Sequence, residues 1–270
     1  GNLYCILMLI IKMIKQILCI LLCCVNLHVY GGVPCDGGAF DPETFVIAGD
    51  KALLIEKTLL KENPRVALIA RVGSDLSQYN LHYSHIAFLI KDTSLQQWNV
   101  IHLLNHCNTA TSSIYNQGLM NFFLDDVYNY DSRLVIPSPL LQNRLFALLH
   151  SQKKLSLHEN QYSLIAYPFS TQYQNSNQWV LELIASALTG ANTRTQIQSW
   201  LRKEHYSPTQ ISIPKIKLLG AKLFKKNIRI DDHPKQERHT NHYTLVSAES
   251  VFNFLAQGHE IIFDKEFRTN

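Results

Sequence analysis

The chain has 270 residues, of which 46% are hydrophobic and 17% are charged. This composition excludes an intrinsically disordered chain, and the length is sufficient to bury a sizeable core in one large domain or two small ones. The formal net charge of +4 falls to +2 without Lys12 and Lys15 of the N-terminal segment, which leaves 23 basic against 21 acidic residues. So small a surplus implies no polyanionic partner, and we expect no nucleic-acid binding because the chain carries no motif for it.

The first 31 residues have the pattern of a secretory signal peptide. Counted from Met13, Lys15 forms a basic region, residues 17–25 form a short apolar core, and residues 29–31 form a small-residue cleavage site. Lysines at positions 12 and 15 also interrupt the apolar run, which disfavours an uninterrupted membrane span.

We therefore expect a signal peptide over residues 1–31, preceded by an over-long start, and a single globular domain over residues 32–270. The mature protein would be periplasmic or secreted, with no stable membrane span after signal cleavage. An uncleaved N-terminal anchor is the main alternative. Lipidation at Cys23 or Cys24 is a weaker one, because the small residues that precede a lipidated cysteine are missing.

Two cysteines, Cys35 and Cys107, lie beyond the signal segment, which holds the other four. In an exported protein two cysteines are most simply one disulfide, here joining the start of the mature chain to its middle. The alternative is a reactive Cys107 thiolate with His102 and His106 nearby.

Apolar patterning predicts a mixture of helices and short strands. Helices are expected over residues 41–61, 141–149, 176 onward, 193–205, 215–226 and 247–257. Strands are expected over residues 65–72, 84–90, 98–104, 133–136, 228–230 and 243–246. The turn at 91–94 makes the second and third strands an antiparallel pair. Because helices and strands do not alternate strictly, we predict an α+β fold in which an antiparallel sheet packs against helices.

Three residues form a candidate catalytic group. His85 begins an apolar strand, His102 lies inside the next strand, and Ser176 lies where a polar cluster meets the apolar period of a helix. A histidine at a strand end can take the proton of a hydroxyl at a helix N-terminus, while a second polar group orients the imidazole. The structural alternative is that the histidines are bonded to backbone, and that Ser176 or Asn177 only caps the helix.

Other polar groups have simpler interpretations. His239 and His242 have the spacing of a metal pair, with Asp231-Asp232-His233 close by, but Pro234 and the polar neighbours indicate a solvated loop. The alternative is that Asp231-Asp232 caps or orients a group in the cleft. The pair Asp125-Asp126 is explained by a turn. We predict no bound metal and no cofactor.

Several unusual segments resemble an uncharacterised bacterial exported family, catalogued as domain-of-unknown-function family 2145. These segments span nearly the whole mature chain, and the family brings no established activity with it. They are ARVGSDLSQYNLHYSHIAF (70–88), VIHLLNHC (100–107), NQGLMNFFLDD (116–126), YPFSTQYQNSNQWVLE (167–182) and DDHP (231–234).

The order of polar groups also resembles the circularly permuted papain-like hydrolases, relatives of the NlpC-type peptidases. Ser84-His85 matches their strand histidine, His102 matches the polar residue on the following strand, and Ser176 falls on their helix nucleophile. The family has cysteine where this chain has Ser176. Because serine has a much higher pKa than a thiol, it needs a true base.

The resemblance implies a papain-like, circularly permuted core and a hydrolase that cleaves an amide or ester bond in the cell envelope. His85 would be the base, Ser176 the nucleophile and His102 the orienting residue, with Gln174 or Asn175 donating to the oxyanion. The partner would be an envelope component or a small peptide or lipid substrate. The rivals are a catalytically inactive envelope module that binds in the same cleft, and an enzyme that uses Cys107.

The disulfide prediction can be checked directly. Mass spectrometry of the exported protein, digested without reduction, should show the Cys35 peptide linked to the Cys107 peptide. Alkylation of Cys107 without prior reduction would contradict the disulfide and favour the reactive thiol.

Overall fold

The computed structural model describes residues 41–92, 97–125, 127–218 and 226–269, all within one compact unit. The predicted signal peptide and Cys35 lie outside these residues, and so does part of the predicted turn at 91–94. None of the described helices is both long enough and apolar enough to cross a membrane.

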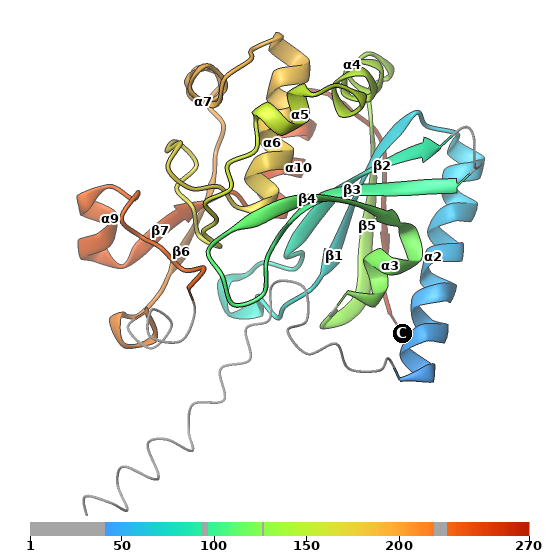
Figure 1. The fold of residues 1–270 in the computed structure, drawn as a ribbon, viewed down its shortest axis with the longest axis horizontal. Helices are drawn as coiled ribbons and strands as arrows, with labels where there is room; N and C mark the ends of the chain where they lie inside the picture. Colours follow the sequence, from blue (N-terminus) through green and yellow to red (C-terminus); the bar gives the residue numbers. More distant parts are fainter. Residues whose placement is uncertain (1–40, 93–96, 126, 219–225, 270) are drawn as a thin grey trace, which may run out of the picture. The chain divides into compact units, whose positions relative to one another are not determined.

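A six-stranded antiparallel sheet forms the centre of the fold, in the order β4-β3-β2-β1-β5-β8 (Figure 1). Its strands are β1 (Val66–Val72), β2 (His85–Asp92), β3 (Gln97–Asn105), β4 (Ser112–Gly118), β5 (Asn129–Pro137) and β8 (Ile261–Phe267). A separate two-stranded sheet pairs β6 (Thr209–Ser212) with β7 (His242–Leu245). The predicted α+β class with an antiparallel sheet is confirmed, as is the antiparallel pairing of β2 with β3.

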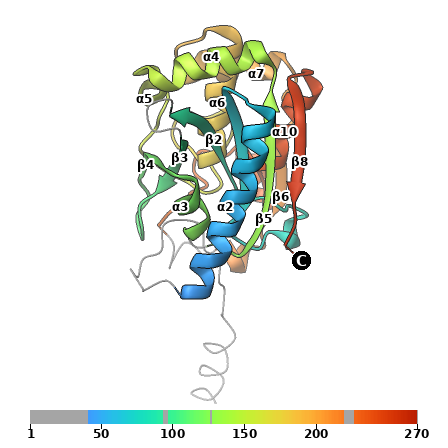
Figure 2. The same cartoon turned by 90° about the vertical axis from the view of Figure 1, so that its right-hand side faces the viewer.

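Helices cover both faces of the large sheet (Figures 1 and 2). One face carries α2 and α3, and the other carries α4, α6 and α10. The helices are α2 (Pro42–Glu62), α3 (Leu119–Leu124), α4 (Pro139–His150), α5 (Lys153–Ser156), α6 (Ser176–Thr189), α7 (Arg194–Lys203), α9 (Lys235–Thr240) and α10 (Ala248–Gln257). The short 3-10 helix η1 (Ser77–Tyr79) follows β1.

Strand alternation divides the core into two clusters. In β2, Ile86 and Phe88 face the cluster beneath α4, α6 and α10, whereas Ala87 and Leu89 face the cluster beneath α2. Successive side chains of a strand point to opposite faces, so one strand supplies both clusters. By the same alternation His85 belongs to the face of α2 and α3.

Two features of the predicted secondary structure need correction. Residues 228–230 form no strand: Arg229 bonds through its backbone to the side chain of Ser163, and Asn227 O accepts from Leu164 N. A side chain therefore takes the place of a ladder partner. The strands β4, β6 and β8, the helices α3, α5 and α9, and the 3-10 helix η1 were not predicted. The helix expected at 215–226 lies partly outside the described residues.

Candidate functional site

The N-terminus of α6 is capped by Asn175. Its Oδ1 accepts the backbone N–H of Gln178 at 2.7 Å, and its backbone is extended. Neither Ser176 nor Asn177 is therefore the cap, which corrects that structural alternative. Because the cap lies one residue earlier, the hydroxyl of Ser176 remains available for another contact at the first helical position.

The second residue of the helix, Asn177, holds the start of strand β2. The β2–β3 ladder ends at the pair Phe88–Ile101, while β2 itself begins at His85. Asn177 Oδ1 accepts from Ile86 N at 3.0 Å, and its Nδ2 donates to Ser84 O at 3.2 Å. The Asn177 carboxamide thus satisfies the backbone groups on either side of His85 that β3 no longer pairs.

The three predicted residues come together at this point. His85 Nδ1 lies 3.1 Å from Ser176 Oγ, and His85 Nε2 lies 2.9 Å from His102 Nδ1. All three are buried, with exposed fractions of 8% for Ser176, 7% for His85 and 0% for His102. The Ser176 hydroxyl and the two imidazoles therefore form one continuous hydrogen-bonded row, which we call the serine row.

An aromatic ring and a guanidinium, from Phe122 and Arg71, lie beside the two imidazoles. The ring of Phe122 from α3 lies 6.0 Å from His85 and 5.6 Å from His102, centroid to centroid. Arg71, the cross-strand partner of His85, packs its guanidinium over the same phenyl ring at 4.7 Å. It also donates through Nη1 to the carbonyls of Phe122 and Asp125.

Both imidazoles are held neutral. Burial, His102 and Arg71 together place the pKa of His85 well below its ordinary value of 6.5. Burial and Arg71 lower the pKa of His102 to about 3. Removing an imidazolium from water costs free energy, and a nearby guanidinium adds repulsion. His85 is therefore a free base at neutral pH.

A further group at the serine, Tyr162, was not predicted. Burial raises its pKa to about 12, and hydrogen bonding with Ser176 only partly offsets this. The Tyr162 hydroxyl therefore stays protonated and can donate beside the serine. Tyr162 is positioned by bridges on both sides: its N–H donates to Ala110 O, and it pairs with Gln174 in a parallel bridge.

The side chains predicted to donate to an oxyanion are already occupied. Gln174 Nε2 donates to Leu157 O at 3.0 Å and to Glu182 at 2.6 Å. Asn175 Nδ2 donates to Leu164 O at 3.4 Å and Val246 O at 3.2 Å. A carboxamide nitrogen has only two N–H donors, so this prediction is wrong for both residues. In the first turn of α6, the amides of Gln178 and Trp179 are bonded to Asn175, and the amide of Ser176 interacts with the Tyr162 hydroxyl. The amide of Asn177 is therefore the candidate donor, since the start of a helix leaves it without an intrahelical partner.

A buried ion pair holds the loop that precedes Ser176. Glu182 is 0% exposed, and its Oε2 lies 2.7 Å from Arg194 Nε. Three glutamine side chains donate to the same carboxylate: Gln174, Gln178 and Gln198. Arg194 also donates to the carbonyls of residues 170, 171 and 173. The loop before Ser176 is thus bonded to α6 and α7.

The segment 231–234 is an anchor rather than the solvated loop predicted. His233 is 3% exposed and uses both ring nitrogens, with Glu237 at 2.8 Å and Ile165 O at 2.6 Å. Asp232 accepts from Tyr167 N at 2.8 Å, and Asp231 accepts from the Tyr173 hydroxyl at 2.7 Å.

Those contacts fasten the chain that leads to Ser176. His242, one member of the possible metal pair, is exposed at the start of β7. Across the described parts of the chain, no three His, Cys, Asp or Glu residues are grouped as a metal site.

Cys107 lies in the turn after β3, apart from the serine row. The ring nitrogens of its neighbour His106 contact the hydroxyls of Thr111 at 3.1 Å and Ser113 at 2.8 Å. His102, the other histidine considered for it, contacts His85 instead. The two histidines that would serve a Cys107 nucleophile are therefore engaged elsewhere.

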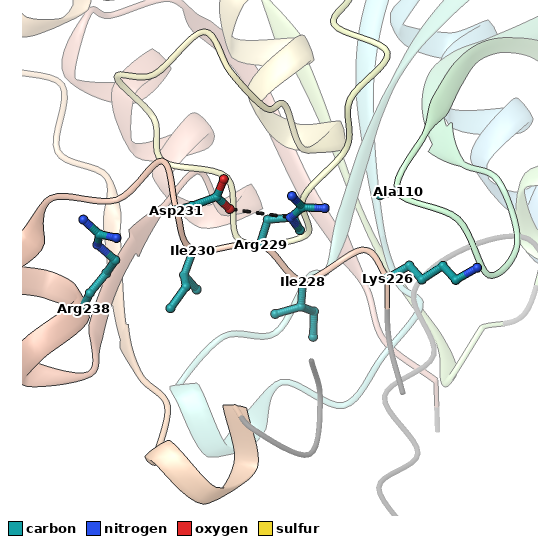
Figure 3. A pocket seen from close by; sticks show the side chains of 7 residues that line it. All are labelled: Ala110, Lys226, Ile228, Arg229, Ile230, Asp231 and Arg238. Atoms are coloured by element: carbon teal, nitrogen blue, oxygen red, sulfur yellow. Dashed lines mark ion pairs between the residues drawn. The ribbon is translucent and has the colours of Figure 1, made fainter. Parts of the chain in front are cut away.

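An open hollow of about 540 Å³ lies beside this region (Figure 3). Its lining residues are Ala110, Lys226, Ile228, Arg229, Ile230, Asp231 and Arg238. Arg229 and Asp231 form an ion pair at 3.5 Å within it, as the dashed line in Figure 3 marks. The lining includes none of the three candidate catalytic residues, so the serine row and the hollow are separate features.

The buried ion pair yields a stability prediction. Glu182→Gln and Arg194→Met should each lower the free energy of unfolding by about 3–5 kcal/mol, because each leaves a buried partner uncompensated. The double variant should lose clearly less than the sum, which urea denaturation would measure as a coupling energy. Exposed Glu204→Gln, the control, should change stability by less than about 0.5 kcal/mol. Additive losses would mean that the pair is not coupled.

Comparison with known proteins identifies the family. A family model described as an uncharacterised protein conserved in bacteria, DUF2145, matches residues 58–255. No curated protein and no solved structure matches the chain. The family predicted from the sequence segments is confirmed, whereas the resemblance to papain-like hydrolases is not. The match covers strands β1 to β5 of the large sheet, the serine row and the buried ion pair, and the chain belongs to the DUF2145 family of bacterial proteins.

Proposed function

We propose that the protein is a serine hydrolase that cleaves an amide or ester bond in the bacterial cell envelope. The observation that carries the proposal is the continuous row from Ser176 Oγ through His85 to His102, with separations of 3.1 and 2.9 Å. Hydrogen-bonding distance between nucleophile and base, with the base contacted by a third group, is the arrangement that nucleophilic catalysis requires.

The reaction would begin with attack of Ser176 Oγ on the acyl carbon. As the new C–O bond forms, the hydroxyl proton passes to His85 Nδ1, and His102 keeps the imidazole in place. Negative charge then develops on the acyl oxygen. The Asn177 amide at the start of α6 and the protonated Tyr162 hydroxyl are the candidate donors to this oxygen, and the positive end of the helix dipole adds to their effect. The bond to the leaving group then breaks as His85 gives its proton to that group. Water, deprotonated by His85, next attacks the acyl-serine, and His85 returns the proton to Ser176 Oγ as the acid product leaves.

The electrostatics indicate a weak base and a modest rate. A general base works best when its pKa is near the operating pH. The pKa of His85 lies well below 6.5 because of burial, His102 and Arg71, and no carboxylate of the described residues contacts its ring directly. Binding of an acyl group whose oxygen becomes negative would offset the repulsion from Arg71 and help the imidazolium to form.

A permuted papain-like architecture in an exported protein is part of the same proposal. It is supported by the chain order, since the strand histidine and the second polar strand residue precede the nucleophile at the start of a helix. It is also supported by the packing of that helix against an antiparallel sheet. The substrate would be a small peptide or lipid of the envelope, and this location follows from the predicted signal peptide.

One observation favours a second candidate, a catalytically inactive binding module. Ser176 and His85 are less than a tenth exposed, and the hollow beside the region does not include them. Buried histidines with a lowered pKa also occur as structural groups. In that case the row would fasten β2, β3 and α6 together, and ligands would bind elsewhere on the domain.

Covalent labelling separates the two functions. A serine-directed fluorophosphonate should label the wild-type protein at Ser176, and Ser176→Ala should abolish the labelling. His85→Gln should slow it about 100-fold or more, because general-base assistance is lost. Exposed Ser156→Ala and His150→Gln serve as controls and should label as wild type does. Equal labelling of wild type and Ser176→Ala would reject the hydrolase.

The pH dependence of labelling reports on His85. The base must be neutral, and its pKa is lowered below 6.5 by burial, His102 and Arg71. The labelling rate should therefore stay level from about pH 8 down to about pH 6, and fall only as the pH drops through that lowered pKa. A rate that halves near pH 6.5, as for an ordinary histidine, would contradict this assignment.

A further inference from the structure

Three hydrogen-bonded groups in a row leave the direction of their protons undetermined. A neutral imidazole has one N–H donor and one acceptor nitrogen. In one arrangement His85 Nδ1 accepts the Ser176 O–H, and His85 Nε2–H donates to His102 Nδ1. In the reverse arrangement His102 Nδ1–H donates to His85, and His85 Nδ1–H donates to the serine. Only the first arrangement leaves the lone pair of His85 on Nδ1, the nitrogen that faces the serine and must take its proton.

The surroundings of His102 Nε2, at the end of the row away from the serine, distinguish the two arrangements. Within the described residues, His102 Nε2 is buried and forms no direct hydrogen bond to satisfy it. Gln117 of β4 lies two residues beyond Tyr115, the cross-strand partner of His102, so its side chain shares the face of the imidazole. Burial and Arg71 lower the pKa of His102, whereas Gln117 raises it. An acceptor facing a ring N–H has this effect.

Asp125 sets which end of the Gln117 carboxamide faces His102. Gln117 Nε2 donates to Asp125 Oδ2 at 2.7 Å. An ionised carboxylate can only accept hydrogen bonds, so the amide nitrogen must point to Asp125 and the amide oxygen away from it. The position of Asp125 is itself held, because Arg71 Nη1 donates to its backbone carbonyl at 2.5 Å.

We propose that Asp125 and Gln117 are positioning residues that fix the proton direction along the whole row. Asp125 accepts from Gln117, Gln117 Oε1 is the acceptor that faces His102 Nε2–H, and His102 Nδ1 accepts from His85 Nε2–H. His85 Nδ1 is thereby left to accept from Ser176. During attack one proton moves, from Ser176 Oγ to His85 Nδ1, while both Nε2 protons stay in place. This inference rests on the proposed function and adds two residues to its site.

The test compares three variants by two measurements. Ring nitrogen NMR of labelled histidines reports which nitrogen carries the proton, and fluorophosphonate labelling reports the reactivity of the serine. In Asp125→Asn the amide of residue 125 can accept or donate, so Gln117 can turn over. We expect mixed tautomers at His85 and His102, and labelling slowed by about tenfold or more, as for a base held in the wrong tautomer.

The exchange variant Gln117→Glu with Asp125→Asn is the decisive rescue. It moves the carboxylate to position 117, where it can only accept from His102, and leaves an amide at 125 that can donate to it. Nε2–H tautomers and wild-type labelling should return. Exposed Asp75→Asn, which removes a carboxylate on the loop before β2, is the matched control and should change neither measurement.

The outcomes separate this inference from the proposed function. Wild-type protein that shows the Nε2–H tautomers but no labelling would reject the hydrolase and leave the proton direction established. Wild-type tautomers in Asp125→Asn, or tautomers that stay mixed in the exchange variant, would overturn the inference even if Ser176 labels. Loss of fold in Asp125→Asn would leave the exchange variant to decide.

Discussion

The hydrogen bonds of Asn177 to strand β2 are the constraint on which the site depends. Beyond the β2–β3 ladder the backbone on either side of His85 no longer pairs with β3, although β1 still pairs with this segment, and the Asn177 carboxamide takes the place of β3. The same residue is the second of helix α6. One side chain therefore fixes the separation between His85 on the strand and Ser176 on the helix. It also explains why the row forms beyond the paired part of the two strands.

A second layer of contacts keeps the helix start where Asn177 needs it. Glu182 lies near the middle of α6 and is fully buried, so its charge requires compensation from every side. Arg194 and three glutamines supply it, and through them the loop before Ser176 is bonded to two helices. The segment 231–234 holds the same loop from its other side. Polar groups that satisfy one another define the geometry here more sharply than apolar packing alone.

The central strands of the large sheet were easier to predict from the sequence than its edge strands. Strands β1, β2 and β3 appear as apolar runs because both faces of the sheet are covered. The edge strands β4 and β8 carry polar and charged residues and are partly exposed, so they lack that signal. The alternation of Ile228, Arg229 and Ile230 imitates a strand, yet its backbone bonds to a side chain instead.

The site was predictable in part for similar reasons. The chain order of His85, His102 and Ser176 was sufficient to group them, because a strand end and a helix start are recognisable positions. Asn175, Ser176 and Asn177 are all good capping residues, so the sequence alone does not tell which one caps. Glu182 was visible as the single charge in an apolar helical run, which indicates a buried, paired carboxylate. Tyr162 and Gln117 gave no such signal, since their contacts depend on which segments lie side by side.

The burial of Ser176 has a thermodynamic consequence. With 8% of the residue exposed, an acyl group reaches Oγ only in molecules whose surrounding segments have moved apart. The apparent dissociation constant of a substrate then equals the intrinsic one divided by the fraction of such open molecules. If opening costs about 2.7 kcal/mol, that fraction is about 1%, and apparent affinity is about a hundredfold weaker. A partner that stabilises the open form would therefore raise the reactivity of Ser176 without touching it.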